Sequence, residues 1–291
     1  MLSFENKKAL RFVITLGTGK FGSSNNDQII LQGFRASADI DKAGGLQMST
    51  LRAKIYGVRQ GDMNSVTTLQ WKPGTLIPNT VEVYAIDGHV ETLVYGGNIV
   101  NAWADYQNMP DVFLHIQAQA GFYNQLKSTT PRSFKGAVDV ASVMAQIAAD
   151  LGYTFENGGV NTKLVDVYLP NTGLEQAKDL CRAAGCDMYL DDKIIAITPP
   201  NVPRKTLVPE VSPQTGLVGY PTFDGVGVNF RTLFNPSVTF GGAFKLVTDV
   251  KQAAGEWVVS SLAHHLESEK PGGAWFSTVR GNANGLAVTG R

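Results

Sequence analysis

The sequence predicts a mainly β chain of the α+β class, in which two similar antiparallel β-barrel domains flank a small α+β module. Three observations predict this class. Apolar and polar residues alternate in the two outer parts of the chain, helical spacing is confined to the middle, and the outer parts repeat similar elements in the same order. We expect domains at residues 1–125, 126–200 and 201–291, because 291 residues exceed the usual size of a single core.

The first part of the chain, up to about residue 125, shows strand-like alternation. Val112, Leu114 and Ile116 fall on one face of a predicted strand, with polar residues between them. Residues 51–55 alternate in the same way, and residues 81–84 form a third strand after a Pro-Asn turn signal. Such alternation is typical of half-buried antiparallel strands.

The middle part, residues 126–200, changes to a helical period. A first helix is predicted between Asp139, as its N-cap, and Gly152, as its terminating residue. A second helix is predicted to start at Thr172 with a capping box to Glu175, and to end at Gly185. Short strands follow each helix, and together these elements predict a compact α+β module. The predicted strands are residues 153–155, 188–190 and 194–197.

The last part begins after the proline-rich linker at residues 199–203 and returns to β-type patterning. Residues 255–267 read as one unusually long strand. At about 3.3 Å per residue, a dozen residues span roughly 40 Å, which is longer than most strands. Strands of that length usually curl around a barrel and serve two sheets in turn.

The two outer parts share an order of elements and turn positions, although their residue identity is low. This similarity predicts an internal duplication. A trimer of such a chain would present six similar domains in a ring, and could dock on a six-fold and on a three-fold object. The corresponding segments are residues 51–57 and 226–233, 79–83 and 235–240, 96–104 and 257–263, and 112–119 and 274–279.

Composition excludes several classes of protein. Twenty-five basic and twenty-five acidic residues give a net charge of zero, which argues against a strong nucleic-acid binder but not against a ring through which DNA passes. The first ten residues lack the apolar core of a signal peptide, and no stretch approaches the ~20 apolar residues of a membrane helix. Two cysteines cannot form a disulfide framework. We therefore expect folding in a reducing cytoplasm, without membrane anchoring.

Several segments together have the spacing of a known family. They are residues 54–58, 62–69 and 94–102, the two predicted helices at residues 141–152 and 176–185, and residues 257–264, 271–273 and Trp275. Through these segments the chain resembles the phage baseplate hub and late-control tail proteins. The resemblance covers most of the chain and rests on strand spacing more than on identity.

The resemblance implies a non-enzymatic hub, a homotrimer with pseudo-six-fold symmetry built from two tail-tube-like barrels per chain. It implies contacts with the tail tube protein, the central spike protein, the tape measure protein and other baseplate proteins, and a channel through which DNA only passes. The protein would lie in the baseplate of the virion tail after assembly in the host cytoplasm. Residues 281–291 are expected to be a flexible arm that orders on a partner, or a frayed end.

Five residues are candidates for contacts between subunits or with ring partners. Tyr56 lies in a segment that carries the resemblance, and Trp257 and Trp275 are aromatic residues expected at ring contacts. His264 and His265 are adjacent, so on a strand they point to opposite faces and do not readily share a metal ion. A polar position at a subunit interface is the favoured interpretation, and no metal or other cofactor is expected.

Other motifs have simpler structural explanations. Residues 17–22 match a dinucleotide-binding fingerprint, but strand-like residues follow instead of the required helix, so a hairpin loop is expected. Cys181 and Cys186 fit core packing at the end of a helix. Asp191 and Asp192 read as turn residues, and no Gly-x-Ser-x-Gly elbow is present.

Two other functions stay open. The first is a cell-wall-binding or cell-wall-degrading tail component, suggested by the small α+β module, and the second is a secretion-system spike protein. A peptidoglycan pull-down and a turbidity assay would separate the first from a hub, which should neither bind nor clear cell walls.

Overall fold

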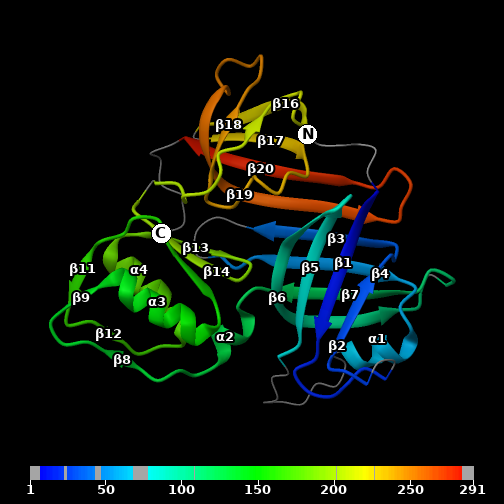
Figure 1. The fold of residues 1–291 in the computed structure, drawn as a ribbon, viewed down its shortest axis with the longest axis horizontal. Helices are drawn as coiled ribbons and strands as arrows, with labels where there is room; N and C mark the ends of the chain where they lie inside the picture. Colours follow the sequence, from blue (N-terminus) through cyan, green and yellow to red (C-terminus); the bar gives the residue numbers. More distant parts are fainter. Residues whose placement is uncertain are drawn as a thin grey trace. The chain divides into compact units, whose positions relative to one another are not determined.

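The computed structural model describes residues 7–22, 25–42, 47–67, 78–107, 109–200, 202–225 and 227–283. The chain forms two compact units, which we call unit 1 and unit 2 (Figure 1). Unit 1 consists of Met1–Asp41, Ser49–Phe122 and Ala263–Ser277. Unit 2 consists of Lys42–Met48, Tyr123–Leu262 and Thr278–Arg291.

Unit 1 is built on antiparallel strand pairs. Its strands run in the spatial order β3-β4-β7-β6-β5-β1-β2, and the C-terminal half of β19 lies beside β3. The short helix α1 (Gln60–Val66) follows β4, and α2 (Phe122–Leu126) begins where unit 1 ends. The strands are β1 (Lys8–Thr15), β2 (Gln28–Gln32), β3 (Ala36–Lys42), β4 (Thr50–Tyr56), β5 (Thr80–Asp87), β6 (Val90–Asp105) and β7 (Phe113–Gln119).

Alternating side chains explain why these strands bury one face. In β4, Leu51, Ala53 and Ile55 are buried and the residues between them are exposed. In β7, Leu114 and Ile116 are fully buried, and this strand pairs with β4 on one side and with β6 on the other. The period of two predicted from the sequence is confirmed in both strands.

The α+β module lies in unit 2. Helices α3 (Val140–Leu151) and α4 (Gly173–Ala184) pack side by side (Figure 1). A three-stranded sheet accompanies them, in the order β10-β14-β13, with β10 parallel to β14 and β13 antiparallel. Its strands are β10 (Thr154–Asn157), β13 (Asp187–Asp191) and β14 (Ile194–Thr198), while β8 (Arg132–Ser133), β9 (Ala137–Asp139), β11 (Lys163–Val165) and β12 (Tyr168–Leu169) form two short ladders, β8 with β12 and β9 with β11.

The helix caps test the local predictions. Asp139 accepts a hydrogen bond from the backbone N–H of Ser142, and Gly152 ends α3 in the left-handed conformation, as predicted. Gly185 ends α4 in the same way. The predicted capping box is wrong, because the Thr172 side chain makes no cap hydrogen bond and Glu175 instead binds Lys178.

The β part of unit 2 is a second run of neighbouring strands around its own core. We call the run of strands in unit 1 the first sheet and this run the second sheet. Its spatial order is β16-β17-β20-β19-β18-β15. The core cluster includes Val228, Phe244, Leu262 and Val279, all at most 2% exposed. The strands are β15 (Glu210–Val211), β16 (Leu217–Asp224), β17 (Gly227–Leu233), β18 (Ala243–Leu246), β19 (Gly255–Ser268) and β20 (Trp275–Ala283).

The two sheets repeat one strand order. The order β3-β4-β7-β6-β5-β1 in the first corresponds, strand for strand and in the same order along the chain, to β16-β17-β20-β19-β18-β15 in the second. One pairing differs: β1 is antiparallel to β5, whereas β15 is parallel to β18. The predicted duplication is therefore present in the topology of the chain.

The mainly β class with a small α+β module is confirmed. The counterpart predicted at residues 235–240 is not a strand: Val238 lies outside any helix or strand, Phe240 lies in a turn, and the strand of this region is β18, a few residues later. Barrel closure and the boundaries of three domains stay predictions. Of the predicted C-terminal arm, residues 281–283 belong to β20 and residues 284–291 lie outside the described residues.

Candidate functional site

Tyr56, the first interface candidate, stands at the end of β4 and is partly exposed. Its ring lies 4.9 Å from that of Phe113, centroid to centroid, and the guanidinium of Arg35 lies 4.5 Å above it. A cation over an aromatic face is held by the quadrupole of the ring. Tyr56 is thus a partly exposed aromatic residue of unit 1 whose ring is held in place by Phe113 and Arg35.

The two histidines of β19 point to opposite faces, as predicted. His264 is only 5% exposed, and its Nδ1 lies 2.8 Å from Ser277 Oγ. His265 is half exposed and contacts the carboxylate of Asp39 on β3. His264 is thus a buried polar residue within unit 1, whereas the side chain of His265 is exposed to solvent.

The two tryptophans pack inside the chain. Trp257 lies against the core cluster of unit 2, and its Nε1 donates a hydrogen bond of 2.9 Å to the carbonyl of Ala253. Trp275 is 7% exposed. Of the five candidates, His264 and Trp275 are buried, Tyr56 and Trp257 are partly exposed, and His265 is about half exposed.

Exposed apolar side chains lie in two segments that the sequence did not single out. On β16, Val218, Tyr220 and Phe223 are 39%, 75% and 55% exposed. Near the end of β6, Val100, Tyr106 and Met109 are 41%, 42% and 74% exposed. Alternation in an edge strand looks the same as in a half-buried strand, so the sequence alone does not separate the two.

A buried ion-pair network joins the α+β module to the β part of unit 2. Asp191 accepts hydrogen bonds from Lys42 Nζ at 2.6 Å and from a guanidinium nitrogen of Arg204 at 2.9 Å. Lys42 also binds Asp192, and Arg204 binds Glu156, each at 2.8 Å. Asp191 is therefore more than the turn residue expected from sequence, since it binds two cations, one of which, Lys42, lies 149 residues earlier in the chain.

Electrostatics favour the charged forms of Lys42 and Asp191. Burial alone would lower the pKa of Lys42, but the carboxylates of Asp192 and Asp191 outweigh burial and raise it. Burial alone would raise the pKa of Asp191, but Lys42 and Arg204 outweigh it and lower that pKa. A carboxylate held ionised between two cations is suited to holding segments together and not to exchanging a proton.

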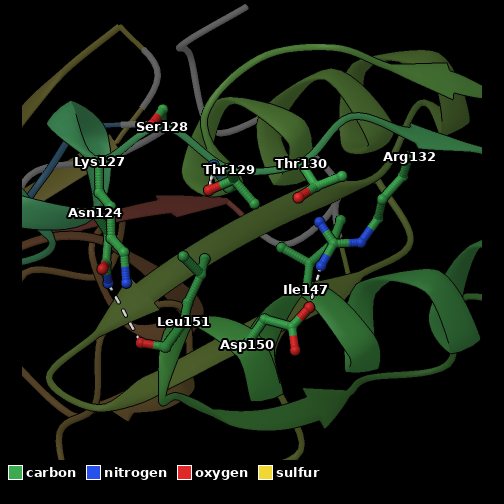
Figure 2. Close-up of a pocket in the computed structure, with 10 residues that line it drawn as sticks. Asn124, Lys127, Ser128, Thr129, Thr130, Arg132, Ile147, Asp150 and Leu151 are labelled. Carbon is green, nitrogen blue, oxygen red and sulfur yellow. Dashed lines mark hydrogen bonds and ion pairs between the residues drawn. The ribbon is translucent and has the colours of Figure 1, made fainter.

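A cavity of about 240 Å³ opens in the α+β module beside the start of α4 (Figure 2). Figure 2 shows Arg132 bound to Asp150 across it, and Asn124 bound to the carbonyl of Leu151. The hydroxyl of Thr129 accepts a hydrogen bond from the backbone N–H of Gly173. These groups are engaged with one another, and Asp150 is the single carboxylate among the lining residues, whereas glycoside hydrolysis uses a pair.

Two sequence motifs resolve into structural features. Residues 17–22 lie in the loop of an antiparallel hairpin between β1 and β2, closed by a hydrogen bond from the Leu16 N–H to the Asp27 carbonyl, so the hairpin prediction is confirmed. Cys186 N–H donates to the Cys181 carbonyl around the left-handed Gly185, which is a Schellman cap. The sulfurs of the two free cysteines lie 3.0 Å apart in the side-chain contact of that cap.

The described residues contain neither a metal-binding cluster nor a membrane-spanning helix. Within that part of the chain, no group of three or more His, Cys, Asp or Glu side chains could hold a metal ion. No helix there is long and apolar enough to span a membrane.

Comparison with known structures supports the fold. A tail protein from Neisseria meningitidis MC58 matches with a TM-score of 0.63 at 9% identity, over 95% of this chain and 98% of that one. The 43 kDa tail protein of prophage MuSo2 from Shewanella oneidensis matches with a TM-score of 0.59 at 8% identity, over 94% and 98%. The c3393 protein of E. coli, a type VI secretion component, matches with a TM-score of 0.58 at 7% identity, over 89% and 75%.

Sequence comparison identifies the family. No curated protein matches the chain. The family model of the baseplate hub gp41 matches residues 25–276, which include most of both sheets and the whole α+β module. The chain therefore belongs to the baseplate hub gp41 family of phage tail proteins.

Proposed function

We propose that this protein is the non-enzymatic structural hub of a phage-type tail, a homotrimer whose pseudo-six-fold ring joins the hexameric tail tube to the trimeric spike. The observation that carries the proposal is the repeated strand order within one chain. Three chains with two similar sheets each supply six similar surfaces, and a closed ring satisfies every interface. One face can then match a six-fold partner while the whole keeps three-fold symmetry.

The family and the fold support a role in the baseplate. The family is that of a baseplate hub, and the E. coli protein of similar fold is described as resembling the phage T4 tail proteins gp27 and gp5. We infer partners of the same kind here: the tail tube, the central spike, the tape measure protein and other baseplate proteins. The protein would lie in the virion tail after assembly in the host cytoplasm.

The charge balance supports a channel that does not hold DNA. With twenty-five basic and twenty-five acidic residues, the chain lacks the basic excess that retains a phosphate backbone. A ring of such chains would let DNA and the tape measure protein pass. Within each chain, we infer two barrel domains around the α+β module, at residues 1–125, 126–200 and 201–291, and subunit contacts that include Tyr56 and His265.

Electron microscopy of the native particle tests the proposal. We expect three copies of the chain in one ring at the junction of tube and spike. A single copy, or a location outside the tail, would contradict it. A peptidoglycan pull-down and a turbidity assay with the purified chain test the alternative, a cell-wall-binding or cell-wall-degrading component, since a hub gives no signal in either.

A further inference from the structure

The long strand β19 pairs with β3, and in the described part of the chain its counterpart β6 has no equivalent strand partner. The pairing of β18 with β19 ends at Ala243 and Val258, and β19 then continues to Ser268 beside β3. Ser268 Oγ donates a hydrogen bond of 3.0 Å to the carbonyl of Phe34, just before β3. The far half of β19 therefore lies beside β3, the strand at the start of the spatial order of the first sheet.

The equivalent strand in the first sheet, β6, also continues past the end of its pairing with the preceding strand. The pairing of β5 with β6 begins at Thr80 and Asn98, and β6 continues to Asp105. The strand pairings described for residues 99–105 are with β7. The counterpart of β3 is β16, which pairs with β17 and ends its sheet. If β16 had the same kind of neighbour as β3, it would lie beside residues 99–105 of a β6 strand.

The side chains on these two segments match in character. Val218, Tyr220 and Phe223 on β16 are exposed and apolar. Val100 on β6, with Tyr106 just after it, is exposed and apolar as well. Monomeric proteins usually protect an edge strand with charged side chains, and β16 carries no charged residue before its last position, Asp224.

The irregular backbone of β16 determines the kind of contact. Its pairing with β17 shifts register between Val218 and Thr222, and Gly219 there has a φ of +71°. Pro221 has no N–H to donate to a neighbouring strand. A partner on this edge is therefore held mainly by apolar side chains and less by a continuous hydrogen-bonded ladder.

We propose that β16 of one copy of this chain packs against the far half of β6 in the next copy. This contact repeats between chains the β3–β19 contact that exists within each chain. It joins two different surfaces, so it is heterologous, and it closes into a ring when the rotation between copies allows it. The proposal rests on the proposed hub function and names the surfaces that would hold the ring together.

Substitution of the exposed aromatic residues tests the contact. The double variant Tyr220→Ser with Phe223→Ser should weaken trimer formation by about tenfold or more for each ring removed, because buried aromatic anchors dominate interfaces. Ile30→Ser is the matched control: Ile30 is 54% exposed on β2, the edge strand at the other end of the strand order, and should leave the trimer unchanged. Native mass spectrometry across a concentration series measures the trimer fraction, and circular dichroism checks folding.

Crosslinking provides a second readout that does not weaken the interface. In a Cys181→Ser, Cys186→Ser background, Val218→Cys is combined with Val100→Cys and treated with a short bismaleimide. We expect covalent ladders up to the trimer when both cysteines are present, and no intermolecular product with either one alone. Crosslinking through Val218→Cys alone would indicate that β16 meets itself, and would overturn the proposal.

The outcomes separate the two proposals. A trimer that persists in the double serine variant and gives no crosslink would refute the β16–β6 contact and leave the hub function standing. A wild-type chain that is monomeric both in solution and in the tail would refute the hub function itself.

Discussion

Replacing Arg204 with Met should destabilise unit 2 more than any surface substitution of the same kind. The guanidinium of Arg204 donates to Glu156, Asp191 and the Phe240 carbonyl, each at 2.8–2.9 Å, and its side chain is 3% exposed. Met keeps the apolar stem but removes all three donors. Asp191, with 11% of its side chain exposed, would keep only Lys42 as a cationic partner.

The expected loss follows from the partners left behind. Removing one member of a buried pair costs about 3–5 kcal/mol, because an uncompensated charge remains buried. Asp191 keeps Lys42, so the lower end of that range, about 3 kcal/mol, is expected. Urea denaturation of the full chain, followed by circular dichroism and tryptophan fluorescence, measures the change in the free energy of unfolding.

A surface arginine provides the matched control. Arg52 pairs with Asp41 at 3.2 Å, but these side chains are 68% and 48% exposed. Arg52→Met should therefore cost no more than about 1 kcal/mol. If Arg204→Met also cost less than about 1 kcal/mol, the buried network would not hold unit 2 together, and the reasoning would be refuted.

Three further predictions concern the stability of unit 2. The pKa of Asp191 is lowered by its two cationic neighbours against the effect of burial. The contribution of Asp191 to the free energy of unfolding is therefore complete above the unfolded pKa of about 3.9, and it is lost as the pH falls through the lower folded pKa. Asp191→Asn should flatten the acid limb of a pH–stability curve measured by urea denaturation. Gly241→Ala should lower the thermal midpoint, since Gly241 has a φ of +76° and an added Cβ would lie 2.6 Å from the Tyr189 ring, and an unchanged midpoint would contradict this geometry. Phe244→Ala should cost about 3–5 kcal/mol because Phe244 is fully buried, whereas Phe223→Ala at the exposed edge should change the stability of the isolated subunit by less than about 0.5 kcal/mol in the same denaturation assay.

Local signals were sufficient to predict much of the fold. Leu51, Ala53 and Ile55 alternate because one face of β4 is buried, and this period depends only on neighbouring residues. Asp139 and Gly152 bound α3 for equally local reasons, a capping hydrogen bond and a left-handed backbone. The order of turns and strands also predicted the duplication, because the corresponding strands follow one another along the chain in the same order in both sheets.

Contacts between residues far apart in the chain could not be predicted from the sequence. Asp191 reads as a turn residue until Lys42, 149 residues earlier, is placed beside it. Val238 and Phe240 alternate like a strand, yet Phe240 is buried against Tyr189, with ring centroids 5.4 Å apart, and the chain turns at Gly241. Burial in a turn produces the same apolar spacing as burial in a strand.

The interface candidates show the same limit. Trp257 and Trp275 were expected at ring contacts because large aromatic residues anchor interfaces. Both pack within the chain, whereas Tyr220 and Phe223 are exposed on β16, a strand with a register shift at Gly219. Which strand ends a sheet depends on pairings between distant segments, and a single sequence does not contain that information.

The most direct test of the central claim is a reconstruction of the tail particle by electron microscopy, computed without imposed symmetry. The account predicts three copies of this chain between tube and spike, in a ring where the two sheets of each chain alternate in six similar positions. A ring in which only one of the two sheets faces the tube would contradict it.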